Sequence, residues 1–494
     1  MQLFKNKYSV KLTLLFTLLL MFCGHAFCYT NLSFSGASVM VDAGKANASL
    51  IADGQFLTTL YWRIRGSLSA PFIVGLLSTV YLAVGALLIV DILELSHPLS
   101  LFALCGSLAL NVSVTAINAA QLHMADVYFL SFFFSVLGAW LCVLHPLGFL
   151  PAAGCFAAVF GLESSMTAVG PFLVMLTVLL RILKGNHVKE QLFTLLRALV
   201  SFTVGFLLYY AAALLFCKRQ GAELNASFHA LTDSGLFGAY LFPIHQLFQP
   251  ATAYASLCAF IFGLLAALSL LSVAVHLRHT TLSGKTLTVI LTLLLPLMLA
   301  MPVFSPEADI SVSQRFACTM LPVAMVALLD LLCSSLMENR VHIMRSITAC
   351  AFGITFLSSI VFANQVYLKK NLEYQSTLSI MTRVIEMAEQ TEGFDVNSTP
   401  VAIVGSIEDS ALSIPHMGFE HLSVLDAAAN NFTASSQDEN TWYFWEIMGY
   451  PFNFVSDYER DQLACTDTVQ TMPAFPEIGC CQMVENTLVI RLSE

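Results

Sequence analysis

Long apolar runs recur along most of this chain, and they constrain its fold more than any other feature. A helix needs about 20 consecutive apolar residues to cross the hydrocarbon of a bilayer. Lipid offers the backbone no hydrogen-bond partner, so a crossing chain must form helices or a closed barrel. The runs here are continuous rather than alternating, and only 11% of the 494 residues are charged while 57% are hydrophobic. The sequence therefore predicts a polytopic α-helical membrane protein and excludes a soluble globule.

We expect about eleven transmembrane helices. Residues 1–28 carry lysines ahead of a Leu/Phe-rich run, which is typical of a membrane anchor or of a cleaved signal. His25–Cys28 is a poor cleavage site, so a retained helix is favoured. The apolar stretch 149–183 is long enough for two short spans, with a break at Gly161–Ser165 and Glu163 near the outer surface. The other segments lie at about 72–93, 99–117, 128–144, 192–216, 251–275, 286–302, 316–336 and 346–363.

Basic residues gather in three of the predicted loops, and they orient the chain. Lysine and arginine are enriched in short cytoplasmic loops. A cytoplasmic N-terminus places all three basic loops inside, makes residues 29–70 an outer loop, and leaves 71–363 as the transmembrane domain. The basic residues are Arg181, Lys184 and Lys189 in the first loop, Arg278 and Lys285 in the second, and Arg340 and Arg345 in the third.

The composition changes after Ala363, which predicts a separate C-terminal domain. Residues 364–494 contain 19 Asp and Glu against 5 Lys and Arg, and no run long enough to cross a bilayer. Residues 364–392 have helical periodicity and are followed by Gly393, a helix-terminating signal. Pro400–Gly405 reads as a buried strand, and residues 482–492 as a hairpin turning at Glu485–Asn486. This order predicts a small α/β domain outside the membrane.

Charged residues in the predicted outer loops are the candidates for chemistry. Transfer of a group from a lipid phosphate needs a carboxylate to take a proton from the acceptor hydroxyl. It also needs cations that bind the departing phosphate, a role that guanidinium groups perform with two parallel hydrogen bonds. The carboxylates available outside are Asp42, Asp53 and Asp126, and the cations are Lys45, Arg63, Arg65 and Arg315.

Structural explanations compete with these roles. Arg63 and Arg65 follow Trp62, a pattern that also anchors a helix at the membrane interface. Asp53–Gly54 is also a turn signal, and Asp42 also suits a helix N-cap. Glu163 fits a loop or helix-end acid better than a catalyst.

At these positions the chain resembles the glucosyl transferase II family, the phage-type O-antigen glucosyltransferases. In that family an outer loop carries Asp-Asp-x-Gly-Arg and, about ten residues later, Asp-Gly-Arg. Val41–Lys45 and Asp53–Gln55 stand in those places, with Val41 at an Asp position, Lys45 at an Arg position and Gln55 at an Arg position. His123–Val127 keeps only the acid of the next motif. Further likeness lies in Ala363–Asn364, Tyr374, Arg383, Pro400–Gly405, Met472–Pro476 and Leu488–Leu492.

The resemblance implies a GT-C-type membrane fold and the transfer of a glucosyl group from a polyprenyl phosphate donor to a surface glycan. It places Asp42 at the base position. We therefore expect an inverting glycosyltransferase of the bacterial inner membrane, in which Asp126 and Lys45 shape the sugar pocket and Arg315 meets the phosphate. Its partners would be the lipid-linked donor, the glycan acceptor and membrane lipid, with no nucleic acid.

Two other functions fit the same helix count. One is a transporter or flippase of lipid-linked sugars, and the other is a non-enzymatic subunit of surface-polysaccharide assembly. The chain has no CxxC pair and no HExxH motif, so neither a metal site nor a cofactor is expected. Among the cysteines outside apolar runs, Cys465 with Cys480 or Cys481 is the candidate for a disulfide.

Overall fold

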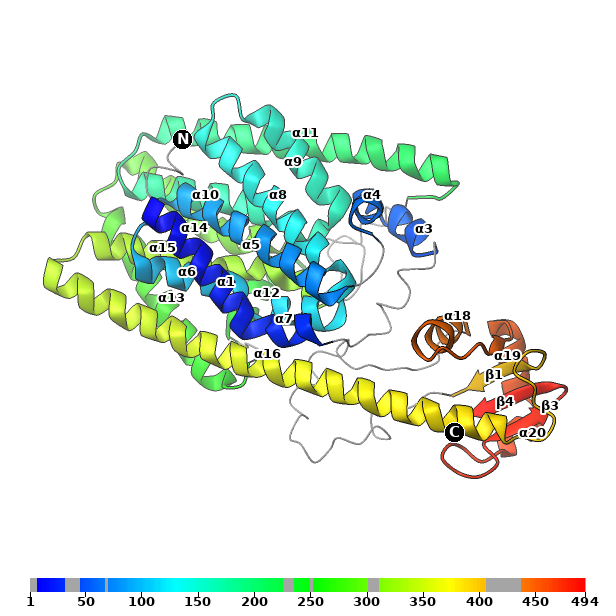
Figure 1. Ribbon diagram of the computed structural model, residues 1–494. Helices are drawn as coiled ribbons and strands as arrows, with labels where there is room; N and C mark the ends of the chain where they lie inside the picture. Colours follow the sequence, from blue (N-terminus) through cyan, green and yellow to red (C-terminus); the bar gives the residue numbers. More distant parts are fainter. Residues whose placement is uncertain are drawn as a thin grey trace. The chain divides into compact units, whose positions relative to one another are not determined.

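The computed structural model describes residues 7–31, 45–66, 70–224, 235–248, 252–300, 311–405 and 437–493. The chain divides into two compact units. One consists of Met1–Thr30, Gly44–Asn118 and Leu122–Asn364, and the other of Asn31–Ala43, Ala119–Gln121 and Gln365–Glu494. Figure 1 gives the order of their elements along the chain.

The first unit is entirely helical in its described part. Ten of its helices or helix pairs there are long and apolar enough to cross a membrane, and the eleventh predicted segment forms the shorter apolar helix α9. The prediction of a multi-pass helical membrane protein is confirmed at this level. The elements are α1 (Lys7–Thr30), α3 (Lys45–Ala52), α4 (Phe56–Arg65), α5 (Pro71–Leu93), α6 (Pro98–Ala109), α7 (Val112–Ala120), η2 (Leu122–Met124), α8 (Ala125–Leu144), α9 (Phe149–Leu162), η3 (Ser164–Met166), α10 (Val169–Leu183), α11 (Val188–Gln220), α12 (Gly235–Phe248), α13 (Ala255–Leu277), α14 (Leu282–Leu299), η5 (Ser313–Thr319), α15 (Met320–Ser334) and α16 (Glu338–Glu389). Helix α16 belongs to this unit as far as Asn364, and its residues from Gln365 on belong to the second unit.

Helices α5, α8, α9 and α11 pack one against the next, as Figure 1 shows. Gly205 of α11 lies so close to α9 that a Cβ atom there would meet the carbonyl oxygen of Ala153 at 2.7 Å. Phe132 and Phe156 are completely buried in this packing. The opposite face of α11 exposes Leu199 and Leu207, as expected of side chains that face lipid.

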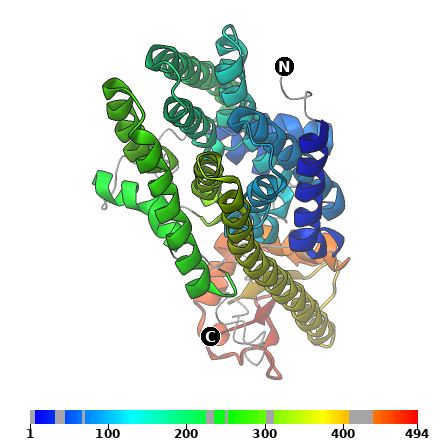
Figure 2. The same ribbon diagram turned by 90° about the vertical axis from the view of Figure 1, so that its left-hand side faces the viewer.

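The segment from α12 to α14, drawn in green, lies along one side of the helical unit in Figure 2. Helix α14 contacts α10, and α13 contacts α15. The sequence analysis did not predict α12, which has only 14 residues and contains Pro243. Its C-terminal end contributes to the cavity described below.

The second unit contains a four-stranded sheet with the order β2-β1-β4-β3. Strand β1 pairs in parallel with β2 and β4, and β3 pairs antiparallel with β4. The predicted hairpin is confirmed, because Glu485 and Asn486 both adopt positive φ in its two-residue turn. The elements are β1 (Pro400–Val404), α18 (Gln437–Trp442), the π-helical turn η9 (Tyr443–Ile447), β2 (Asn453–Phe454), α19 (Asp457–Ala464), α20 (Asp467–Thr471), β3 (Cys481–Val484) and β4 (Thr487–Arg491).

The helix predicted over residues 364–392 is confirmed as far as Glu389, but it does not start at Asn364 and does not extend to Gly393. Helix α16 continues without a break from Glu338 to Glu389. The apolar span and the amphipathic segment share one backbone because neither glycine nor proline separates them at Ala363–Asn364. Gly393 does have positive φ, +85°, but it follows the helix by four residues.

The disulfide expected at Cys465 is not formed. Cys465 is an exposed free thiol, and Cys480 and Cys481 are also free. The sulfur atom of Cys480 instead lies 3.9 Å from that of Cys481.

Candidate functional site

The predicted site residues fall into three groups. Asp42 lies outside the described residues, and so does the side chain of Lys45, the first residue of α3. Asp53 and Arg63 are exposed, Asp53 in the turn between α3 and α4 and Arg63 on the outer face of α4. The remaining residues, Asp126, Arg65 and Arg315, are placed by tertiary packing.

Helices α3 and α4 form a short platform on the ends of α9 and α11. A tight turn joins the two helices at Gly54, whose φ is +81°. The sequence places apolar residues on one face of α4, and Phe56 and Trp62 are buried there, 4% exposed each. The indole of Trp62 is therefore packed inside the protein rather than at a lipid interface.

Arg65, at the end of α4, forms a buried ion pair with Asp126, in the first turn of α8. The guanidinium nitrogen Nη1 lies 3.0 Å from both carboxylate oxygens, and the two side chains are 3% and 0% exposed. The hydroxyl of Tyr61 donates to the same carboxylate at 2.9 Å. The cation also lies 6.0 Å from the ring of Trp62. Three hydrogen bonds and one cation–ring contact therefore hold the two charged groups in a fixed geometry.

Engaged in this way, Asp126 is better suited to positioning α4 than to accepting a proton. Burial, and then the adjacent charge of Asp126, raise the pKa of Tyr61. The phenol therefore stays protonated at neutral pH and remains a donor. Nη2 of Arg65 is buried without a hydrogen-bond partner among the described residues, so the pair retains one unused donor.

A second buried acid lies beside the platform, at the predicted break between α9 and α10. The break is confirmed, and the side chain of Glu163 at this break is buried, 2% exposed. It accepts hydrogen bonds from the backbone of Ser165 at 3.2 Å and from Gln55 at 3.4 Å. Thr58 of α4 donates to the carbonyl of Leu162 at 2.8 Å. Glu163 thereby ties the platform to the end of α9.

Arg315 lines a cavity of about 90 Å³ in the same helical unit. The guanidinium lies 5.7 Å from the ring of Phe242 and within 3.5 Å of the amide oxygen of Gln246, both on α12. The other lining residues are Leu110, Asn111, Val112, Ser113, Leu247, Thr252, Phe262, Cys318, Thr319, Pro322 and Ser359.

A break in the third predicted span opens one wall of this cavity. Helix α6 ends at Ala109 and α7 begins at Val112. The side chain of Asn111 caps the new helix by accepting from the backbone of Val114 at 3.0 Å, and its amide donates to the carbonyl of Leu108 at 3.0 Å. Asn111 thus provides hydrogen-bond partners for a backbone carbonyl at the end of α6 and a backbone amide at the start of α7. The chain can therefore turn within the predicted span without leaving these groups unpaired.

Two hydroxyl groups in the cavity wall, those of Thr252 and Thr319, are buried and have no hydrogen-bond partner among the described residues. Buried polar groups in proteins are normally paired. A guanidinium together with two unused hydroxyl donors suits an oxyanion, and the volume exceeds the roughly 10–15 Å³ that one water needs. The sequence analysis identified Arg315 but missed these threonines and Gln246, because they come from separate segments with no common motif.

Aromatic packing connects the segment that carries Arg315 with α8. Phe316, next to Arg315, packs against Phe129 and Phe132 with ring centroids 6.1 and 5.3 Å apart. Phe129 and Phe132 follow Asp126 by about one and two helical turns. The segment with Arg315 and the helix with Asp126 are therefore joined by packed aromatic rings.

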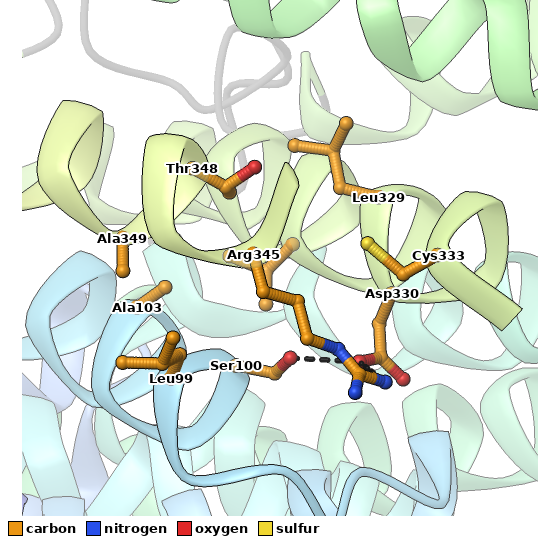
Figure 3. Close-up of a pocket in the computed structure, with 10 residues that line it drawn as sticks. Leu99, Ser100, Ala103, Leu329, Asp330, Cys333, Arg345, Thr348 and Ala349 are labelled. Atoms are coloured by element: carbon orange, nitrogen blue, oxygen red, sulfur yellow. Dashed lines mark hydrogen bonds and ion pairs between the residues drawn. The ribbon is translucent and has the colours of Figure 1, made fainter. Parts of the chain in front are cut away.

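A third polar cluster joins α6, α15 and α16 and is drawn in Figure 3. Ser100 donates to Asp330 at 2.7 Å, and Arg345 lies 3.6 Å from the same carboxylate. The adjoining cavity is only about 20 Å³, room for one water. This cluster fits a structural ion pair between helices.

The part of the chain that the structure describes holds no group of three His, Cys, Asp or Glu side chains placed to bind a metal. Comparisons with known protein families, with curated proteins and with solved structures found no match to this chain.

Proposed function

We propose that this protein is a membrane glycosyltransferase that takes a sugar, of which glucose is the best candidate, from a polyprenyl phosphate donor. The observation that carries the proposal is the Arg315 cavity. It combines a guanidinium and two unused hydroxyl donors with the apolar side chains of Leu247, Phe262 and Pro322. A lipid phosphate is complementary to this lining, because its anionic head matches the guanidinium and hydroxyl groups and its apolar tail matches the apolar side chains.

The reaction requires little of this cavity beyond charge stabilisation. An acceptor hydroxyl attacks the anomeric carbon of the sugar, the bond from that carbon to the phosphate oxygen breaks, and the phosphate leaves with the electron pair. Arg315 stabilises the leaving charge. A carboxylate takes the proton of the hydroxyl, and Asp42 is the proposed base, with Asp53 as the described carboxylate nearest to it in sequence.

The proposed orientation places this chemistry outside the cytoplasm. The three basic loops then lie inside, and the second unit lies outside as a soluble α/β domain. The GT-C-type architecture and the bacterial inner membrane are part of the same proposal.

The test is transfer of radiolabelled sugar from a polyprenyl phosphate donor by the full-length protein in vesicles. Arg315→Gln should lower the rate by about 100-fold or more, as removal of a charge-stabilising donor does elsewhere. Arg219→Gln is the matched control, because Arg219 is an exposed arginine at the end of α11. Equal rates for Arg315→Gln and the control would reject the phosphate role.

The same vesicle assay distinguishes a glycosyltransferase from the two alternative functions. Movement of labelled lipid across the bilayer without a new glycosidic bond would identify a flippase. Neither transfer nor movement, with loss of surface polysaccharide when the gene is deleted, would identify an assembly subunit.

A further inference from the structure

The sulfur atom of Cys480 has two sulfur neighbours in the core of the second unit. The thiol of Cys480 donates to the thioether of Met387 at a distance of 3.9 Å, and it lies 3.9 Å from the thiol of Cys481. Cys480 is fully buried, Cys481 is 8% exposed, and Met387 is partly exposed. The three side chains come from α16, the turn before β3 and the first residue of β3.

The spacing of these atoms suits a shared metal ion. With a metal–sulfur bond of about 2.3 Å, sulfur ligands lie about 3.8 Å apart in a tetrahedral set and about 4.0 Å apart in a trigonal one. The two measured separations, 3.9 Å each, fall between these values. Both neighbours of Cys480 therefore lie at a separation that a shared ion allows, and the flexible side chain of methionine can adjust to bring the third sulfur to the same ion.

The backbone around the two cysteines is held in place without a metal. The amide of Cys480 donates to the carbonyl of Glu477 at 3.2 Å, and the carbonyl of Cys480 accepts from the amide of Arg491 at 2.8 Å. Cys481 pairs with Ile490 in the sheet. Ligands on rigid elements lose little entropy on binding, which favours a preformed site.

The ligand type selects the ion. Two thiolates and a thioether are soft donors, which favour monovalent copper, whereas calcium and magnesium require oxygen ligands. Zinc in structural sites takes four nitrogen or sulfur ligands. Three sulfur atoms match the low coordination number of a soft monovalent ion better.

We propose that Met387, Cys480 and Cys481 form a binding site for a soft monovalent metal ion, Cu(I) in the first instance. On binding, the two thiols lose their protons to solvent and the ion keeps its oxidation state. The resulting site carries one net negative charge. A cation of opposite sign on this face of α16 is Arg383, one helical turn before Met387, with its guanidinium 5.1 Å from the ring of Phe475. The site is independent of the sugar-transfer proposal.

The experiment uses the full-length protein, purified in detergent and reduced. Under anaerobic conditions Cu(I) is titrated in competition with the chelator bathocuproine disulfonate. We expect one equivalent retained by the native protein and by Cys465→Ser, and none by Cys480→Ser/Cys481→Ser. X-ray absorption should find sulfur neighbours only, at about 2.3 Å.

Met387→Leu keeps the volume of the core and removes only the thioether. It should weaken Cu(I) binding by about tenfold or more, the scale reported even for residues that merely orient a ligand. Equal affinity of Met387→Leu and the native protein would remove Met387 from the site. Equal retention by the double cysteine variant would overturn the proposal, and so would a Cys480–Cys481 disulfide that persists, by mass, after reduction.

Discussion

Replacing Asp126 by Asn leaves the guanidinium of Arg65 buried without its counter-charge. Both side chains are almost fully shielded from solvent, so neither water nor salt compensates the loss. Loss of one partner from a buried ion pair costs about 3–5 kcal/mol. Asn keeps an acceptor for the hydroxyl of Tyr61, which places the expected cost near the lower limit, about 3 kcal/mol.

A double substitution distinguishes the effect of the lost charges from the effect of altered packing. Arg65→Met with Asp126→Asn removes both charges and keeps most of the packing. The two substitutions together should cost less than the sum of the single ones by about 2–3 kcal/mol, the upper part of the range of about 0.5–3 kcal/mol found for residues in direct contact. The free energy of unfolding can be measured in detergent by denaturant titration, with tryptophan fluorescence as the signal. Trp62 lies beside the pair and should report its loss.

Arg63→Gln is the matched control, since Arg63 is exposed on the same helix. Its substitution should change the unfolding free energy by about 0.5 kcal/mol or less. The reasoning is refuted if Asp126→Asn costs no more than this control, or if the effects at Arg65 and Asp126 simply add.

Two further predictions concern the turn at Gly54 and the loop at His97. Gly54→Ala should lower the thermal midpoint, because it combines a strained φ, worth about 1–3 kcal/mol, with a Cβ atom that would collide with the hydroxyl of Tyr209. Gly66→Ala, where φ is also positive but no atom of the described residues outside the glycine and its chain neighbours lies within 4 Å of the new Cβ, should lower it less. Equal shifts of the two variants would dismiss the steric clash. Burial, and then the charge of Arg345, lower the pKa of His97, so its contribution to stability is complete above its ordinary pKa of about 6.5 and is lost as the pH falls from there toward the folded-state pKa. His97→Asn keeps a helix-capping side chain and should reduce the change of the thermal midpoint with pH between about pH 7 and pH 5. If the variant and the native protein show the same pH dependence, other groups determine it.

The order and number of apolar helices followed from the sequence because the bilayer imposes a length and a composition on every span. Even the break at Gly161–Ser165 was predictable, since one span cannot use the whole stretch from 149 to 183. The hairpin at Glu485–Asn486 was predictable for a local reason, the preference of its turn for residues that tolerate positive φ. The last residue of α16 was not predictable, because a glycine marks where a helix can end but does not determine how many residues before it are still helical.

The candidate site was only partly accessible to the sequence. The sequence identified the charged residues of the outer loops as candidates, yet nothing local distinguished Arg65, which is buried against Asp126, from Arg63, which is exposed two residues earlier. That difference is a matter of helix phase, because only one of the two side chains points toward α8.

By itself, the sequence determined that this protein folds in lipid. A chain this apolar pairs its backbone polar groups within helices wherever lipid replaces water. Tertiary structure alone decided which polar groups meet. Arg315, Thr252 and Thr319 line one cavity, and Met387 reaches Cys480 across 93 positions, because long-range packing brings together residues whose separation in the chain carries no periodic signal.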